Sequence, residues 1–277
     1  MFLNNINDSE LIKLGILKNS EYVNAHPFPN IFMDDVFNPE LLLKIKEEFP
    51  SLNKKENDIV YNNPNENKLA TKGERKFGTE TKKLMHYLNS QPFLEFLQEL
   101  TGIEETLIPD PYFEGGGFHE SKRNGYLKIH VDFHKHKKTK LDRRLNVLIY
   151  LNEDWKEEYN GHLELWERDM SKCAKKILPI FNRMAIFSTT DYSYHGLPDP
   201  ILCPEYRSRQ SMALYYYSNG RPKNEILPGN ENRITTTFVS RTEKDTFGMK
   251  AFNGMVNLLN DLLPPIVVRW IKKFRKT

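Results

Sequence analysis

The sequence predicts an α+β protein that is mainly β, and its patterning supports this in three ways. From Pro109 to about Tyr217, short apolar runs alternate with polar residues and are separated by turn signals such as Asn124-Gly125 and Asn160-Gly161. No long segment with helical period interrupts this region, and evenly spaced strands of this kind favour an antiparallel sandwich or jelly roll. The preceding third carries helical patterns, so we expect N-terminal helices to buttress one sheet.

The predicted N-terminal elements follow from apolar spacing and from helix-start signals. They are, in order, a helix-prone polar segment at 1–24, a short strand at 31–33, a helix that opens at Pro39, an exposed loop at 51–79 and a second helical run at about 80–101. The loop is rich in Asn, Lys and Glu. We expect it to become ordered only with substrate.

We predict a single domain over residues 1–277. It comprises a helical N-terminal support at 1–108, a β core at 109–222 and a C-terminal extension at 223–277. Between Ile266 and Phe274, apolar residues can form a stripe opposite basic ones. A packing or partner-binding helix is the expected role of this stripe, and peripheral membrane contact is the alternative.

Composition excludes several classes of protein. The formal net charge of +3, from 40 basic and 37 acidic residues, is too small to indicate nucleic-acid binding. We find neither a signal peptide nor a run approaching the ~20 apolar residues of a transmembrane helix. Cys173 and Cys203 sit in no metal-ligand spacing, and nothing indicates a disulfide scaffold. We therefore expect a cytoplasmic protein.

Three residues form a candidate metal site. If 126–133 is a strand, then His130 and Asp132 project from the same face, because alternate residues of a strand share a face. A third candidate ligand, His195, lies on another segment flanked by turns. Two histidines and one carboxylate make up the facial triad of non-haem Fe(II) oxygenases, which leaves metal positions open.

The His-x-Asp pair alone is a weak signal, because a chain with 8 histidines produces such pairs by chance. A structural histidine and a surface aspartate are the alternative. The context favours a metal site, since a strand-like segment beyond His195 carries Arg209, Ser211 and Ala213 on one face. A buried arginine facing a polar cavity needs an anion, and its planar fork suits a carboxylate. The alternative is that Arg209 is a surface residue beside Arg207.

Seven short motifs then follow one another along the chain. They are Gly-Gly-Gly-Phe-His-Glu at 115–120, Leu-Lys-Ile-His-Val-Asp-Phe at 127–133, Asn-Val-Leu-Ile-Tyr-Leu-Asn-Glu-Asp-Trp at 146–155, Gly-His-Leu-Glu-Leu-Trp at 161–166, Asn-Arg-Met-Ala-Ile-Phe at 182–187, His-Gly at 195–196 and Arg-Gln-Ser-Met-Ala-Leu-Tyr-Tyr-Tyr at 209–217. Taken in order, they resemble the prolyl 4-hydroxylase-like branch of the 2-oxoglutarate- and Fe(II)-dependent dioxygenases.

The resemblance implies a cupin-like double-stranded β-helix with Fe(II) at one mouth and 2-oxoglutarate as cosubstrate. Arg209 matches the arginine that binds the distal carboxylate of 2-oxoglutarate, and Tyr150 matches a tyrosine that hydrogen-bonds the same group. The gap between His195 and Arg209 is longer than the family usually shows. We expect residues 199–204 to loop out, which leaves Arg207 as a rival anchor.

The implied reaction is hydroxylation of an unactivated C–H bond, with release of succinate and CO2. Asp132 favours hydroxylation, because halogenating relatives have a small residue at that position. The substrate is open between a prolyl residue of a peptide and a small molecule, and ascorbate is an open further cofactor. The alternatives are a non-enzymatic jelly-roll module that binds a small molecule and a metal enzyme that does not use 2-oxoglutarate. The intact triad with Arg209 argues against the binding module, and Arg209 on its strand argues against the metal enzyme without 2-oxoglutarate.

Other histidines are expected to have other roles. His134 and His136 lie in the basic run 134–138, which we interpret as a solvated loop that could recruit an acidic substrate. His119 and His162 are equally compatible with a place in the pocket wall and with a structural role.

Overall fold

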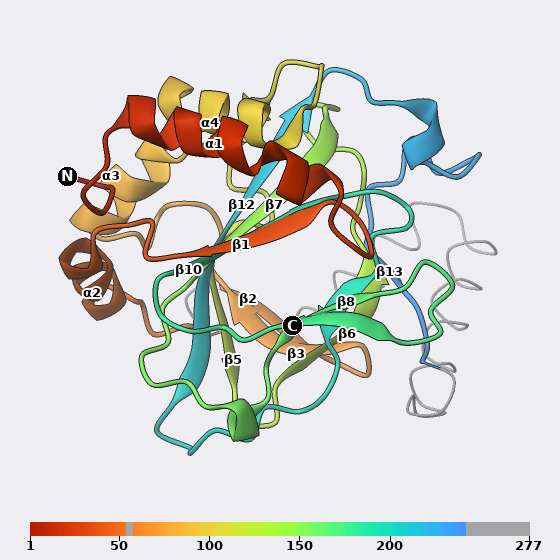
Figure 1. The fold of residues 1–277 in the computed structure, drawn as a ribbon. Coiled ribbons are helices and arrows are strands. Elements are labelled where there is room, and N and C mark those ends of the chain that lie inside the picture. Colours follow the sequence, from red (N-terminus) through yellow and green to blue (C-terminus); the bar gives the residue numbers. More distant parts are fainter. Residues whose placement is uncertain (54–57, 242–277) are drawn as a thin grey trace.

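A computed structural model describes residues 1–53 and 58–241 of the chain (Figure 1). Its helices are α1 (Asp8–Val23), α2 (Pro39–Glu47), α3 (Thr79–Tyr87) and α4 (Gln91–Thr101). Its strands are β1 (Asn30–Asp34), β2 (Ile59–Asn63), β3 (Glu66–Ala70), β4 (Ile108–Pro109), β5 (Gly117–Lys122), β6 (Tyr126–Val131), β7 (Asp142–Tyr150), β8 (Leu163–Trp166), β9 (Cys173–Ile177), β10 (Arg183–Ser188), β11 (His195–Leu197), β12 (Ser208–Ser218) and β13 (Thr237–Phe238). Short 3-10 turns lie at Glu157–Tyr159 and Lys223–Glu225.

The strands join one curled antiparallel sheet, in the order β1-β10-β7-β12-β5-β3-β6-β11-β8-β9. Strand β3 pairs with both β5 and β6, so it links the larger layer to the smaller layer that holds β6, β11 and β8. Most pairs join strands that are distant in sequence, as β12 with β7 and β11 with β6. This nearly closed antiparallel barrel confirms the predicted mainly β, jelly-roll architecture.

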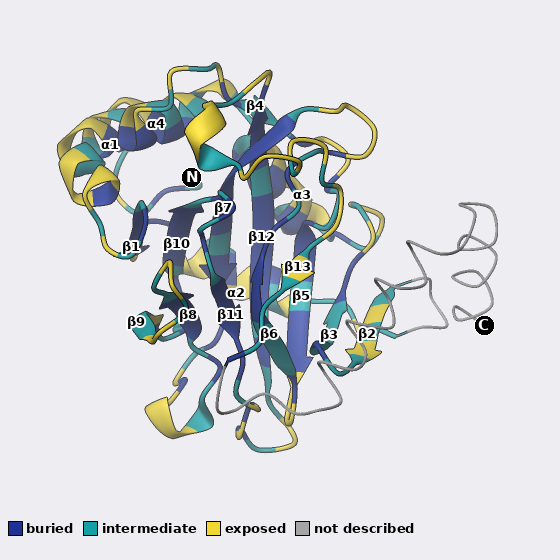
Figure 2. Cartoon of the chain, turned by 90° about the vertical axis from the view of Figure 1, so that its right-hand side faces the viewer, coloured by how far each residue is buried: buried dark blue, intermediate teal, exposed yellow. Residues whose placement is uncertain are grey.

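Alternation along β7 explains how one strand serves both the core and the interior of the barrel. Val147 and Ile149 point to the helices and belong to the main hydrophobic core. Asn146 and Leu148 face the opposite way and line an internal cavity. This is the two-residue period of a strand with both faces covered. The central strands are accordingly buried along most of their length, while exposure concentrates on helices and loops (Figure 2).

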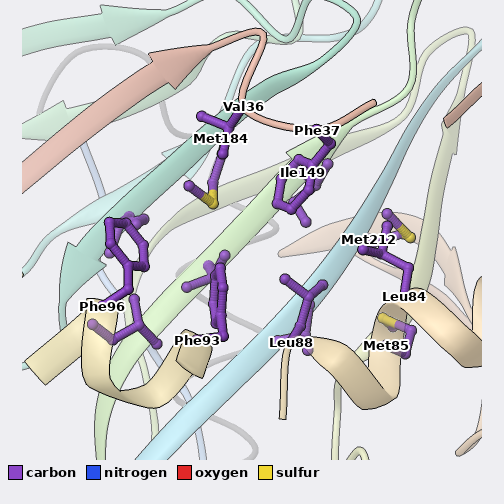
Figure 3. Packing of buried hydrophobic residues seen from close by; sticks show 14 of the residues in the cluster. Val36, Phe37, Leu84, Met85, Leu88, Phe93, Phe96, Ile149, Met184 and Met212 are labelled. Carbon is purple, nitrogen blue, oxygen red and sulfur yellow. The ribbon is translucent and has the colours of Figure 1, made fainter. Parts of the chain in front are cut away.

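The helices cover the outer face of the larger layer. In Figure 1, α1 and α4 lie together across β7 and β12. Figure 3 shows Phe93 and Phe96 of α4 directed towards Ile149 and Met184 of the sheet, all of them buried. The single helical run expected at 80–101 is wrong, because two helices occupy it. Pro92, in the first turn of α4, lacks a backbone N–H and suits a helix start rather than a helix interior.

The expectation of an exposed loop at 51–79 is also wrong. Strands β2 and β3 form a hairpin there, and β3 is embedded in the sheet through β5 and β6. The polar composition of residues 59–70 concealed these strands. Inter-strand hydrogen bonds between backbone groups hold these strands, and such bonds do not require apolar side chains on a face of the sheet that is exposed to solvent.

The β structure continues beyond the predicted end of the core at 222, because β13 pairs with β6. Residues 199–204 do not simply loop out, since Ile201 and Cys203 are buried beside Trp155. Both cysteines are free. Among the described residues, no helix has the length and apolar content needed to cross a membrane. The stripe expected between Ile266 and Phe274 lies outside the described residues.

Truncating the core under the helices should destabilise the protein strongly. Phe93 is fully buried, whereas Leu17 on α1 is 76% exposed. We expect Phe93→Ala to lower the free energy of unfolding by about 3–5 kcal/mol, through lost burial and the cavity left behind. The control, Leu17→Ala, should change it by no more than about 0.5 kcal/mol. Urea unfolding followed by circular dichroism measures both, and equal effects would contradict the assigned packing.

Candidate metal centre

The three predicted ligands converge at one end of the barrel. His130 is in β6, Asp132 follows that strand directly, and His195 begins β11. Strands β6 and β11 are antiparallel neighbours with His130 opposite His195, so the two rings lie 4.3 Å apart between centroids. One ligand atom from each of the three residues lies within 4.8 Å of the others, and all three residues are buried.

Both imidazoles are oriented by the main chain. Nδ1 of His130 lies 2.9 Å from the carbonyl oxygen of Lys128, and Nδ1 of His195 lies 2.8 Å from that of Ser193. A carbonyl oxygen can only accept, so Nδ1 donates in each ring and Nε2 keeps its lone pair. The Nε2 atoms are 3.7 Å and 3.4 Å from the carboxylate oxygens of Asp132. This is the usual way in which an outer hydrogen bond fixes the tautomer of a metal-binding histidine.

The carboxylate of Asp132 is held in place by two residues of β7. Asn146 donates to its Oδ2 at 2.8 Å, and Nη2 of Arg143 lies 3.1 Å from the same oxygen. Asn146 also accepts from the guanidinium of Arg143, which packs over the ring of Tyr215 with its carbon 3.5 Å from the centroid. The carboxylate oxygen Oδ1 makes none of these contacts. It therefore stays available to a cation.

Local electrostatics suit metal binding. Burial and the neighbouring His195 lower the pKa of His130 to about 3, and burial also lowers the pKa of His195. Both rings are therefore neutral near pH 7, which is the form that binds a metal. Burial by itself raises the pKa of Asp132. Arg143 and the two histidines outweigh burial and hold that pKa below its usual range, so the carboxylate stays ionised.

A cavity of about 160 Å³ opens at the three ligands and extends into the barrel. Arg209 of β12 lies on its wall and is 5% exposed. Its Nε donates to the carbonyl of Gly161 at 2.7 Å. Within residues 1–53 and 58–241, no carboxylate lies within ion-pair distance of its guanidinium. A buried cation without an anionic partner is costly, so this wall is suited to an anionic ligand.

Tyr150 and Arg207 differ in their relation to this wall. The ring centroid of Tyr150 is 4.9 Å from the guanidinium carbon of Arg209, and its buried hydroxyl has no hydrogen-bond partner of normal geometry in the described part of the chain. Tyr150 does not itself line the cavity. Arg207 lies outside it as well, and its guanidinium donates to the main-chain carbonyl of Glu153.

The residues present fit an Fe(II) centre with 2-oxoglutarate. Two neutral imidazoles and one carboxylate are the donor set that non-haem Fe(II) oxygenases use. The guanidinium of Arg209, which has no carboxylate partner among the described residues, offers donors to a carboxylate at the far side of the cavity.

The structure corrects the interpretation of the basic run 134–138. His134 and His136 are each 1% exposed, so they do not belong to a solvated loop. His134 lies 2.9 Å from the carboxylate of Asp191, and His136 lies 3.4 Å from that of Asp110. The alternating lysines stay at least partly exposed and misled the sequence interpretation.

Sequence reasoning left His119 open and missed Arg143 and Asn146. His119 lines the cavity, with its Nε2 2.9 Å from the carbonyl of Gly115. His162 instead contacts Glu157, outside the cavity. Alternation along β7 would have indicated Asn146, because it lies on the same face of the strand as Tyr150. Nothing in the sequence indicates Arg143, because its side chain reaches the site past an irregularity where β7 and β12 shift register.

Comparison with known proteins agrees with this site. Residues 116–217 match the model of a family described as the 2OG-Fe(II) oxygenase superfamily. That segment contains all three candidate ligands together with Arg209 and Tyr150. No curated protein matches the chain in sequence.

Solved structures share the fold at low sequence identity. A prolyl hydroxylase from Trichoplax adhaerens, in complex with a peptide fragment of the hypoxia inducible factor oxygen degradation domain, is 16% identical, with a TM-score of 0.52 over 76% of this chain and 91% of that one. A prolyl-4-hydroxylase from Pseudomonas putida is 13% identical, with a TM-score of 0.51 over 74% and 100%. The carbocyclase SnoK of nogalamycin biosynthesis, which is non-heme and alpha ketoglutarate dependent, is 9% identical, with a TM-score of 0.52 over 78% and 87%.

Because these sequence identities are low, the solved structures support the jelly-roll fold alone. The family match adds the chemistry, since it covers the strands that carry the buried triad. Together they confirm the predicted resemblance and the expectation of an enzyme that depends on Fe(II) and 2-oxoglutarate. The segment 116–217, which carries all three candidate ligands, matches the 2OG-Fe(II) oxygenase superfamily.

Proposed function

We propose that this oxygenase hydroxylates an unactivated C–H bond, with Fe(II) held by His130, Asp132 and His195 and with 2-oxoglutarate anchored by Arg209. The observation that carries the proposal is the convergence of three buried ligand atoms within 4.8 Å of one another, on the same cavity as a buried arginine without a carboxylate partner. The ring of Tyr150 packs against the guanidinium of Arg209 and so supports the anchor.

Fe(II) with 2-oxoglutarate supplies the oxidising chemistry when bound, with succinate and CO2 as products. The protein's own residues bind and orient. Asp132 occupies a metal position with an ionised carboxylate, and Asn146 and Arg143 hold it there. Arg209 fixes the far carboxylate of the cosubstrate through its planar fork. Leu163 and Phe187 line the same cavity and reduce access of water to the reacting centre.

We further propose a prolyl residue of a polypeptide as the target. A surface groove of about 680 Å³ runs past β2 and the loops around residues 72–76 and 111–114, and it shares Gly115 with the wall of the metal cavity. A cleft of this size is in the range that proteins use for small ligands, so it can hold a short segment of a polypeptide. Tyr112, which is 50% exposed, offers an aromatic surface within it.

The charges of this groove favour acidic residues beside the target. Two of its carboxylates pair with lysines, Asp58 with Lys76 and Glu114 with Lys137, and Glu74 contacts His86. In the described part of the chain, three of its cations have no carboxylate partner, namely Lys72, Arg75 and Lys138. Groove charges of one sign attract a substrate segment of the other sign.

Removing a triad ligand should weaken iron binding strongly without unfolding the protein. We expect Asp132→Ala and His195→Ala each to weaken Fe(II) binding by more than the factor of about 10–100 that loss of an outer-shell partner causes. His162→Ala, which changes a histidine outside the cavity, is the matched control and should bind Fe(II) as the unmodified protein does. Anaerobic titration calorimetry measures the affinities. Unchanged affinity in both triad variants would refute the assigned ligands.

The two candidate anchors can be separated directly. We expect Arg209→Ala to raise the Kd of 2-oxoglutarate about 10- to 100-fold, the effect of losing hydrogen bonds between charged groups. Arg207→Ala should leave it unchanged, since Arg207 lies outside the cavity. The visible charge-transfer band of the anaerobic Fe(II) complex reports binding. Weaker binding in Arg207→Ala alone would show that the anchor is wrongly assigned.

The substrate proposal is tested by succinate release. With Fe(II), 2-oxoglutarate and ascorbate, peptides with proline between glutamates should stimulate release more than peptides with proline between lysines. The double variant Lys72→Glu with Arg75→Glu should lessen or reverse that preference, because both cations lie in the groove. Stimulation by free amino acids, with none by any peptide, would count against a polypeptide substrate. No succinate under any condition would favour a non-enzymatic binding module.

A further inference from the structure

Residues 221–238, which we call the strap, follow the last long strand of the barrel and return to the metal site. At the far end of the strap, β13 pairs with β6, with Phe238 opposite His130 and Thr237 opposite Val131. The ring of Phe238 lies 5.5 Å from that of His130, between centroids. Phe238 and Thr236 both line the metal cavity. The strap therefore forms part of the wall at the site.

Arg233, in the middle of the strap, connects it to the residue Asp132. Nη2 of Arg233 donates to the main-chain carbonyl of Asp132 at 2.7 Å and lies 2.8 Å from the carboxylate of Asp191. The carbonyl of Arg233 accepts from the backbone N–H groups of His134 and Lys135, at 2.8 and 3.0 Å. The main chain on both sides of Phe133 is thus bound by one residue of the strap.

Asp191 is the fixed point of this arrangement. Its Oδ2 accepts from the backbone N–H of Leu227 and from Asn230, and its Oδ1 contacts Arg233 and His134. Its side chain is fully buried, and it lies in the loop between β10 and β11, four residues before His195. One carboxylate therefore ties the strap to the segments that carry Asp132 and His195.

The hydrogen bonds of His134 form a consistent set. Arg221 can only donate, so Nδ1 of His134, 3.0 Å from its Nη1, is the acceptor. Nε2 then carries the proton and donates to Asp191 at 2.9 Å. Nη2 of Arg233 also lies 3.0 Å from this Nε2, but two donors do not bond to each other, so its partners are the Asp132 carbonyl and the Asp191 carboxylate. Nη1 donates to Oγ1 of Thr237 within the strap, at 2.9 Å. Nη2 thus has one partner at the metal site and one that anchors it.

We propose that Arg233 is a positioning residue for the metal centre, acting on Asp132 through its main-chain carbonyl. Strand β6 ends at Val131, so a side chain rather than the β6 ladder binds that carbonyl. The direction of the Asp132 carboxylate depends on how its backbone is held, and supporting bonds of this kind tune a metal site. This inference rests on the proposed role of Asp132 as a ligand of Fe(II).

The test compares Arg233→Gln with Arg233→Lys and with Asn230→Ala. Asn230 binds Asp191 from the same strap but does not touch Asp132, so its loss loosens the strap alone. Nη2 of Arg233 alone contacts both the Asp132 carbonyl and the Asp191 carboxylate. Lysine also presents one charged nitrogen donor, so it can replace these two contacts. The readouts are Fe(II) affinity, the wavelength of the charge-transfer band of the Fe(II) complex with 2-oxoglutarate, and thermal unfolding of the metal-free protein.

We expect Arg233→Gln to raise the Kd of Fe(II) about 10- to 100-fold, as loss of an outer-shell partner does, and to shift the band. Arg233→Lys should restore most of the affinity and the original band. Asn230→Ala should lower the unfolding temperature while leaving both unchanged.

Wild-type Fe(II) affinity and an unshifted band in Arg233→Gln would overturn the proposal. An equal shift of the band in Asn230→Ala would also overturn it, because loosening of the strap would then account for the change. If Arg233→Gln does not fold, the proposal is tested on Arg233→Lys, through its Fe(II) affinity and the wavelength of its charge-transfer band. A lysine variant that folds but binds Fe(II) as weakly as a triad variant would also overturn the proposal. Failure of the unmodified protein to bind Fe(II) would instead refute the proposed function, and this inference with it.

Discussion

The pairing of β6 with β11 is the constraint on which the site depends. Antiparallel register sets His130 directly opposite His195, although 64 residues separate them in the chain. A slip of one residue would turn either histidine to the other face of its strand, because side chains alternate. The outer neighbours β3 and β8 hold this pair in the barrel, so the ligand geometry follows from the closure of the sheet.

The site also requires charges to be buried, and the surrounding residues make that tolerable. Asp132 is stabilised by Arg143 and Asn146, and Asp191 by Arg233 and several hydrogen bonds. Unpaired buried charge is costly, so a fully bonded network is the arrangement expected around permanent ions. Arg209 departs from this pattern, since the described residues give it no carboxylate. That exception marks the wall where we propose that 2-oxoglutarate binds.

The sequence allowed the mainly β fold to be predicted because turn signals and period-two alternation are local properties of the chain. The candidate ligands could be chosen because a histidine and a carboxylate two residues apart share a strand face. The hairpin of β2 and β3 could not be recognised, since its pairing partners are distant and its residues polar. The burial of His134 depends on Asp191 and Arg221, which only the folded chain brings to it.

X-ray absorption of the anaerobic protein loaded with Fe(II) tests the central claim most directly. Our account predicts one iron per chain, whose scattering requires two imidazole rings and only oxygen or nitrogen in the remaining positions. His195→Ala should remove the contribution of one ring, since His195 and His130 supply the pair. A spectrum of the unmodified protein with one imidazole or none, or with sulfur bound to iron, would contradict the shared coordination sphere.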